Sequence, residues 1–125
     1  MIHLDTSFVI RALLKGSEED RRLRGWLRDG AAVGASVIVW TEFLCGPVHP
    51  NDVELATMVI EERVPFTAED ATLAASLFNE TGRRRGSLAD CMIAATAIRC
   101  SAALATSNMG DFAGFRAAGL SIIET

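Results

Sequence analysis

Short apolar runs alternate along this chain with longer segments that have helical periodicity. Strands are predicted at residues 2–4, 31–35, 102–105 and 120–123, and a weak strand is predicted at 64–66, where Pro65 suits only a sheet edge. Strands that alternate with helices form parallel βαβ units with right-handed crossovers. The pattern therefore predicts an α/β fold, in which functional groups gather outside the carboxyl ends of the strands.

Polar residues that cap helices mark where the helical segments begin. Ser17, Ser36, Asn51, Thr67 and Ser87 each stand before such a segment, and their side chains can accept a hydrogen bond from the first helical turn. Periodicity alone does not distinguish strand from helix over residues 37–46. The length of that segment and the Gly-Pro pair at its end favour a junction near Ser36, with strand before it and helix after it.

The composition restricts the class of protein. The chain has 125 residues, half of them hydrophobic, which suits a single domain over residues 1–125 with a real core. Twelve Lys and Arg against sixteen Asp and Glu give a net charge of −4, so any contact with nucleic acid must be local. No signal peptide or membrane span is visible, so we expect a cytoplasmic protein without membrane contact.

The chain has three cysteines, all in apolar helical stretches: Cys45, Cys91 and Cys100. No two of them form a Cys-x-x-Cys pair. This spacing fits neither a disulfide framework nor a structural zinc site. We expect all three to be small buried hydrophobic residues.

Two acidic residues stand at positions where a carboxylate is costly. Asp5 ends the first apolar run, where it either caps a helix or contributes to a site. Glu42 lies in a segment that is apolar nearly all round, with no Lys or Arg between Arg28 and Arg63. It therefore faces solvent, pairs with a distant arginine, or belongs to a functional site.

Asp90 and Asp111 offer a similar choice. Asp90 lies in the first turn of a predicted central helix, where it either favours the helix dipole or faces a site. Asp111 follows the fourth predicted strand, in a polar loop that leaves the same sheet edge as Asp5.

Four acids at one sheet edge would repel each other strongly. Two carboxylates ~4 Å apart, at an effective dielectric constant of ~20, repel by about 4 kcal/mol. A divalent cation supplies enough charge in a small volume to offset this, and oxygen ligands with open positions suit Mg²⁺ or Mn²⁺. The acids therefore predict a magnesium or manganese site.

The order of these motifs resembles the PIN domain family over essentially the whole chain. The motifs are an apolar run followed by Asp-Thr-Ser at residues 2–7, Thr41-Glu42, L-x-D-x-x-I-A-A-x-A at 88–97, and T-x-N-x-x-D-F at 106–112. In length the chain is similar to the VapC-like toxins of type II toxin–antitoxin modules. The resemblance implies a three-layer α/β/α sandwich with a five-stranded parallel sheet.

The resemblance also implies a metal-dependent endoribonuclease that leaves 5′-phosphate and 3′-hydroxyl ends. Its catalytic acids would be Asp5, Glu42, Asp90 and Asp111, with Asp5, Asp90 and Asp111 as direct ligands of Mg²⁺ or Mn²⁺. Supporting hydrogen bonds to the acids and to the substrate phosphate would come from Ser7, Thr106 and Asn108.

Partners are implied as well. They would be an RNA substrate, a cognate VapB-like antitoxin and a second copy of the chain in a homodimer. The basic segment Arg83, Arg84 and Arg85 either grips RNA phosphates beside the site or is a solvated connection.

Other classes of protein lack their functional groups here. A phosphatase of the haloacid-dehalogenase type needs a second acid two residues after Asp5, where this chain has Ser7. No nucleotide-binding or zinc-protease motif is present. The alternative that stays open is a non-catalytic PIN-like module that binds RNA or protein.

Overall fold

The structure is a computed structural model that describes residues 1–81 and 88–123. Five strands form one sheet in the order β3-β2-β1-β4-β5, and every neighbouring pair is parallel. The strands are β1 (Ile2–Leu4), β2 (Val33–Ser36), β3 (Glu62–Val64), β4 (Ala103–Ala105) and β5 (Ser121–Ile122). The predicted α/β fold with a five-stranded parallel sheet is confirmed.

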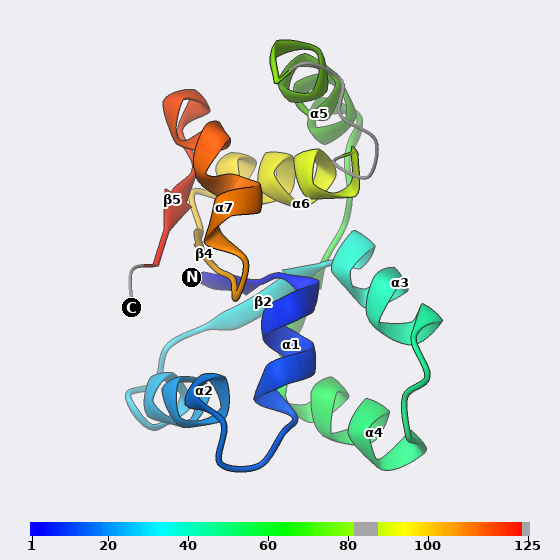
Figure 1. Ribbon diagram of the computed structural model, residues 1–125, viewed down its shortest axis with the longest axis vertical. Coiled ribbons are helices and arrows are strands. Elements are labelled where there is room, and N and C mark those ends of the chain that lie inside the picture. The colour runs from blue at the N-terminus through cyan, green and yellow to red at the C-terminus, as the bar shows by residue number, and fades with distance from the viewer. Residues whose placement is uncertain (82–87, 124–125) are drawn as a thin grey trace.

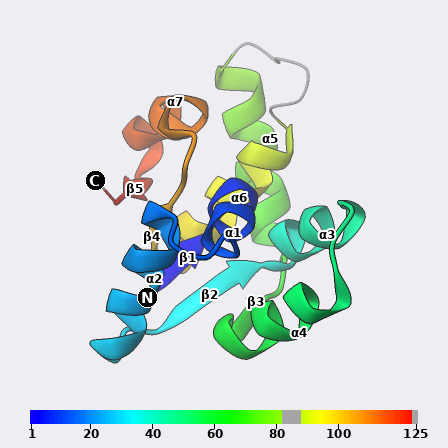
Figure 2. The ribbon, with the colours of Figure 1, turned by 60° about the horizontal axis from the view of Figure 1, so that its bottom comes forward.

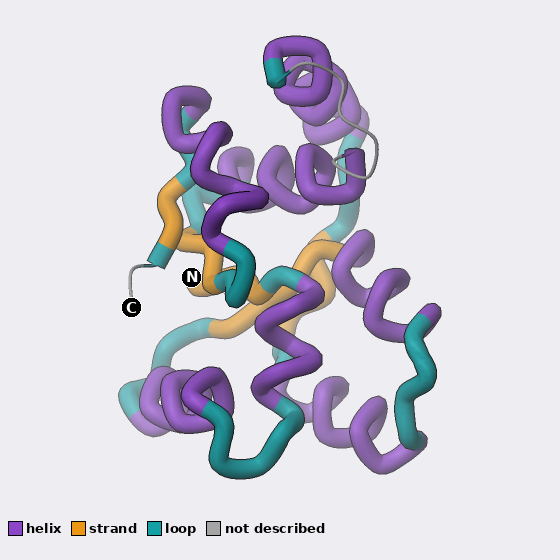
Figure 3. The backbone as a smooth tube through the Cα atoms, in the orientation of Figure 1, coloured by secondary structure: helices purple, strands orange, loops and turns teal. Residues whose placement is uncertain are grey.

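Helices cover both faces of this sheet. They are α1 (Thr6–Ala12), α2 (Glu18–Arg28), α3 (Val37–Cys45), α4 (Pro50–Val59), α5 (Ala68–Glu80), α6 (Leu88–Arg99), α7 (Met109–Phe112) and the 3₁₀ helix η1 (Ala113–Ala118). In Figure 1, α1, α2 and α4 lie below the strands and α5, α6 and α7 lie above them. In the rotated view of Figure 2, α4 and α5 again lie on opposite sides of β2. The tube in Figure 3 makes the central position of the strands plain.

The strand order reverses direction beside β1. The chain runs outward from β1 to β2 and β3, then returns to place β4 on the other side of β1. In parallel sheets the crevice at such a reversal, outside the carboxyl ends of the strands, is where ligands bind. Residues that follow β1 and β4 therefore occupy the favoured position for a site.

The core lies on both faces of the central strands. Leu4 and Leu104 are buried on β1 and β4, and Phe8 is buried on α1, where it stacks on Trp26 of α2 with ring centroids 5.5 Å apart. On β2, Gly34 lets the neighbouring strand β3 approach closely, because a Cβ at this position would lie 3.0 Å from the carbonyl oxygen of Glu62. Small residues thus let neighbouring elements pack tightly.

Three predicted helix starts are confirmed. Ser17, Ser36 and Thr67 cap α2, α3 and α5 with their side chains. Thr67 and Asp70 form a reciprocal capping box. The prediction that Asn51 caps the next helix was wrong. Its backbone N–H instead donates to Nδ1 of His49, and α4 begins with Pro50 because proline needs no N–H partner at that position.

Two further expectations are corrected. The edge strand β3 ends at Val64, so Pro65 lies beyond it rather than within it. Of the cysteines, only Cys91 is buried, whereas Cys45 is exposed and Cys100 is half-buried. Cys45 is the last residue of α3 and Cys100 follows the end of α6, and helix ends project toward solvent more than helix centres do.

An ion pair between a partly exposed arginine and a fully buried aspartate joins α6 to the start of α5. Arg99 donates from Nε to Oδ1 of Asp70 at 2.6 Å and from one terminal nitrogen to the carbonyl oxygen of Pro65 at 3.0 Å. Thr96 also donates to Asp70, at 2.9 Å. Burial raises the pKa of Asp70. The hydrogen bonds that Asp70 accepts from Arg99, the Thr67 amide and Thr96 outweigh this effect, so the pKa of Asp70 lies below its usual value.

Across residues 1–81 and 88–123, every helix is too short or too polar to span a membrane.

Candidate active site

Asp5 follows β1 and is buried, with only 3% of its surface exposed. Its carboxylate caps α1 by accepting the backbone N–H of Phe8 at 2.8 Å. The hydroxyl of Ser7 donates to both carboxylate oxygens, at 2.9 and 3.1 Å, and the hydroxyl of Thr106 donates to Oδ2. Asp5 is thus a helix cap, one of the two alternatives drawn from the sequence, and the hydroxyls of Ser7 and Thr106 also hold its carboxylate at the strand end.

Burial raises the pKa of Asp5 above its ordinary value, and the hydrogen bonds from Thr106, Phe8 and Ser7 oppose this. The negative charge of Glu42 raises the pKa further. The site therefore stores an electrostatic cost that a bound cation would relieve.

The loop that follows β4, residues 106–108, wraps around Asp5, and we call it the site loop. In addition to the bond from Thr106 to Asp5, the backbone N–H of Ser107 donates to Oγ of Ser7 at 3.2 Å. The backbone N–H of Asn108 donates to Oγ1 of Thr106 at 2.9 Å. Two segments a hundred residues apart are thereby tied to one carboxylate.

Glu42 lies on α3 and its residue is exposed. Its Oε1 accepts a hydrogen bond of 2.6 Å from the hydroxyl of Thr6, the first residue of α1. Among the described residues Glu42 forms no ion pair with an arginine, and of the alternatives drawn from the sequence it faces solvent. It also lines a pocket together with the other three acids.

Asp90 and Asp111 lie in the first turns of α6 and α7. Burial, followed by the charges of Asp111, Glu42 and Asp5, raises the pKa of Asp90 to about 6. All three of the other acids thus disfavour the ionised form of Asp90.

The four predicted acids line a single pocket of about 250 Å³. It also contains Ser7 and Asn108 of the predicted supporting residues, whereas Thr106 reaches the site through Asp5. The helices that carry these residues meet beside the carboxyl ends of β1 and β4 in Figure 1. Sequence reasoning missed the roles of Thr6 and Ile10, which also line the pocket, because nothing local to them indicates it.

The chemistry of this pocket suits a hard divalent cation. Among the described residues, the charged groups that line it are carboxylates, which are the ligands that Mg²⁺ and Mn²⁺ prefer. In the described part of the chain, no three His, Cys, Asp or Glu side chains stand close enough together to hold an ion as they are. The donor set and the mutual effect on the pKa of Asp90, rather than a preformed coordination sphere, therefore favour a metal.

Arg83, Arg84 and Arg85 lie outside the described residues. His3 is buried, and burial, the N-terminal amine and Arg99 lower its pKa to about 4, so it is a neutral core histidine.

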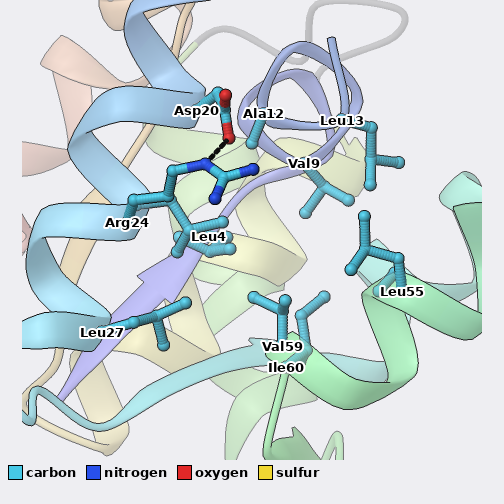
Figure 4. Close-up of a pocket in the computed structure, with 12 residues that line it drawn as sticks. Leu4, Val9, Ala12, Leu13, Asp20, Arg24, Leu27, Leu55, Val59 and Ile60 are labelled. Carbon is cyan, nitrogen blue, oxygen red and sulfur yellow. Dashed lines mark hydrogen bonds and ion pairs between the residues drawn. The ribbon is translucent and has the colours of Figure 1, made fainter. Parts of the chain in front are cut away.

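A second cavity, of about 140 Å³, opens between α1, α2 and α4 (Figure 4). Its walls are largely aliphatic, and the ion pair of Asp20 with Arg24, 2.8 Å long, lies at its edge. Helix α1 lines both cavities, because Val9 and Ala12 face this one while Thr6 and Ser7 line the acidic pocket. We call this second cavity the apolar pocket.

Comparison with known proteins adds a family and a set of similar folds. The family model of the PIN domain matches residues 2–115. A search among curated proteins finds no match.

Several solved structures have a similar fold. VapBC2 of Rickettsia felis bound to a promoter DNA fragment is 22% identical, with 98% of each chain covered and a TM-score of 0.76. A toxin–antitoxin complex of Klebsiella pneumoniae is 22% identical, with 99% of this chain and 97% of that one covered and a TM-score of 0.76. VapBC-1 of nontypeable Haemophilus influenzae is 20% identical, with 99% and 98% covered and a TM-score of 0.74. These likenesses extend over the full length of the sheet and its helices.

Proposed function

Because this chain belongs to the PIN domain family, we propose that it is a metal-dependent endoribonuclease and the toxin of a cytoplasmic toxin–antitoxin system. It would hydrolyse RNA phosphodiester bonds and leave 5′-phosphate and 3′-hydroxyl ends. The observation that carries the proposal is the single pocket at the sheet reversal, into which Asp5, Glu42, Asp90 and Asp111 all project.

Asp5, Asp90 and Asp111 would hold Mg²⁺ or Mn²⁺ in this pocket. When bound, such an ion lowers the pKa of water and offsets the charge of the scissile phosphate. The hydroxyls of Ser7 and Thr106 hold the carboxylate of Asp5 in one orientation. That carboxylate would therefore bind the ion without a change of rotamer.

Glu42 has a different role in the proposal. It is exposed, and Thr6 donates to one oxygen of its carboxylate, whereas the second oxygen has no protein hydrogen bond among the described residues. Glu42 would accept a proton from the attacking water and orient that water toward the phosphate. Asn108, at the rim, would donate to a phosphate oxygen.

The test is cleavage of a defined RNA pool by the purified protein, with sequencing of the 5′ ends. We expect cleavage that requires Mg²⁺ or Mn²⁺, stops with a chelator and is abolished by Asp90→Asn in a protein that stays folded. Cleavage by Asp90→Asn at the wild-type rate, or cleavage in chelator, would refute the site. Binding of RNA without cleavage would favour the non-catalytic PIN-like module.

The proposed antitoxin would bind through the apolar pocket. The similar structures include toxin–antitoxin complexes, and the pocket offers an aliphatic surface with the guanidinium of Arg24 at its edge. An antitoxin helix with apolar residues on one side and an acid beside them would fit this surface.

Two exposed residues of α4 provide a matched test of this interface. Leu55 lines the apolar pocket and is 46% exposed, whereas Met58 is 72% exposed and does not line it. We expect Leu55→Glu to abolish neutralisation of growth arrest by a co-expressed antitoxin, and Met58→Glu to leave it intact. Equal effects of the two substitutions would place the antitoxin elsewhere.

We also propose a homodimer. Large apolar side chains stand exposed on the described surface, including Leu14 at 61% and Leu88 at 50%, and their contact with a second copy would remove them from water. Light scattering at micromolar concentration tests this, and a strictly monomeric species would refute it.

A further inference from the structure

Glu19 on α2 is an acid outside the pocket that nevertheless contacts the site loop. Its Oε2 accepts a hydrogen bond of 2.8 Å from the hydroxyl of Ser107, 88 residues along the chain. This hydrogen bond is the first cause of a lowered pKa for Glu19, so the group is a carboxylate and the bond is charge-assisted.

From Ser107 the contact continues to the catalytic acids. The backbone N–H of Ser107 donates to Oγ of Ser7, and that hydroxyl donates to both oxygens of Asp5. The chain of hydrogen bonds thus runs from Glu19 through Ser107 and Ser7 to Asp5. The same loop leads within three residues to Asp111.

Helix α2 is a firm support for this contact. Trp26 stacks on Phe8 of α1, and the guanidinium of Arg22 lies 5.2 Å from the ring centroid of Trp26 and 5.6 Å from that of Phe8. These contacts fix α2 against α1, the helix that Asp5 caps. Glu19 is therefore held at a set position relative to Asp5.

We propose that Glu19 is a positioning residue that fixes the site loop against Asp5 through Ser107, and so sets the geometry of the acidic site. The part of this proposal that concerns metal binding rests on the proposed function. The part that concerns the fixed loop rests on the hydrogen bonds alone. A position in the first turn of α2 would by itself only favour the helix dipole. The dipole effect is shared by the neighbouring Glu18, whereas the bond to Ser107 is not.

The experiment uses Glu19→Ala, Ser107→Ala and their double variant, with Glu18→Ala as the control. Glu18 is exposed in the same helical turn and has no hydrogen-bonded side-chain partner among the described residues. Glu19→Gln keeps an acceptor oxygen and serves as the conservative variant. Two quantities are measured: hydrogen exchange at the Ser107 and Asn108 amides without metal, and the Kd for Mn²⁺ by calorimetry.

We expect Glu19→Ala to speed exchange at both amides about tenfold and to weaken Mn²⁺ binding about tenfold, the lower end of the effect of groups that support metal ligands. The double variant should be no worse than either single one, because both remove the same contact. Glu19→Gln should recover most of both quantities, and Glu18→Ala should match the wild type.

Three outcomes would overturn the proposal or its premise. Equal exchange in Glu19→Ala and Glu18→Ala would show that Glu19 does not fix the loop. Faster exchange with an unchanged Kd would show that the fixed loop does not set the geometry of the site. If the wild type binds no Mn²⁺, the proposed metal function fails, and the exchange comparison alone decides whether Glu19 holds the loop.

Discussion

The carboxylate of Asp90 lies in the first turn of α6 beside three other acids. Its pKa of about 6 in the folded protein exceeds the ordinary value of 3.8, so the unfolded chain releases its proton more readily. The ionised group therefore destabilises the metal-free fold above pH 6, and this penalty disappears as the pH falls toward 4.

We expect Asp90→Asn to stabilise the metal-free protein at pH 7.5 by about 1–2 kcal/mol, after discounting for partial exposure to solvent. The gain should shrink as the pH falls from 6 to 4. Urea unfolding in the presence of a chelator measures both effects.

Asp52, in the first turn of α4, gives the matched comparison. Asp52→Asn removes a carboxylate that favours its helix dipole, so we expect a loss of up to about 1 kcal/mol. A loss for Asp90→Asn as well would contradict the crowding of acids in the pocket.

Asp5 and Asp90 are acids of the same pocket, but we expect their substitution to affect the stability of the fold differently. Asp5 accepts hydrogen bonds from the Phe8 amide and the hydroxyls of Ser7 and Thr106. Relief of repulsion in Asp5→Asn is therefore offset by weaker hydrogen bonds to these donors. We expect no stabilisation from Asp5→Asn in the same urea measurement, and a gain equal to that of Asp90→Asn would contradict this.

Between elements, the ion pair of Arg99 with Asp70 joins α6 to the start of α5, with Asp70 fully buried and the side chain of Arg99 29% exposed. Arg99→Met keeps much of the side-chain volume but leaves a buried carboxylate without its cation. We expect a loss of about 3 kcal/mol in the free energy of unfolding at pH 7. The control is Arg24→Met, which breaks the surface pair with Asp20 and should cost less than about 1 kcal/mol.

The pH dependence of this loss identifies its cause. The pKa of Asp70 is lowered in the fold, so the stability that it contributes is complete above its ordinary value of 3.8 and is lost as the pH falls through the folded pKa. The difference between the wild type and Arg99→Met should therefore narrow below pH 4. A difference that stays constant down to pH 2.5 would indicate lost packing rather than lost charge pairing.

At the scale of the whole molecule, binding of a metal ion by the four acids should make the fold more stable. A cation that binds only the folded protein raises the free energy of unfolding by about 1.4 kcal/mol at ten times its Kd. We expect Mg²⁺ or Mn²⁺ to raise the melting temperature of the wild type and to raise that of Asp90→Asn less. The same ions should raise the melting temperature of Asp52→Asn as much as that of the wild type. An equal rise in all three proteins would indicate non-specific binding.

Local patterns along the chain were enough to predict the class of fold and the acids that line the pocket. Alternating strands and helices dictate parallel crossovers, and parallel strands bring their carboxyl ends to one sheet edge, so Asp5 and Asp111 could be placed together from local patterns. The caps at Ser17, Ser36 and Thr67 were equally local, since each depends on a contact within three residues.

How distant side chains meet could be seen only in the folded chain. Thr6 with Glu42 and Glu19 with Ser107 are separated by 36 and 88 residues, and no periodic pattern encodes such a pair. The exposure of Cys45 likewise depended on where α3 ends relative to its neighbours. Local propensity acts over a few residues, whereas these contacts depend on the packing angles of helices against the sheet, which the chain as a whole sets.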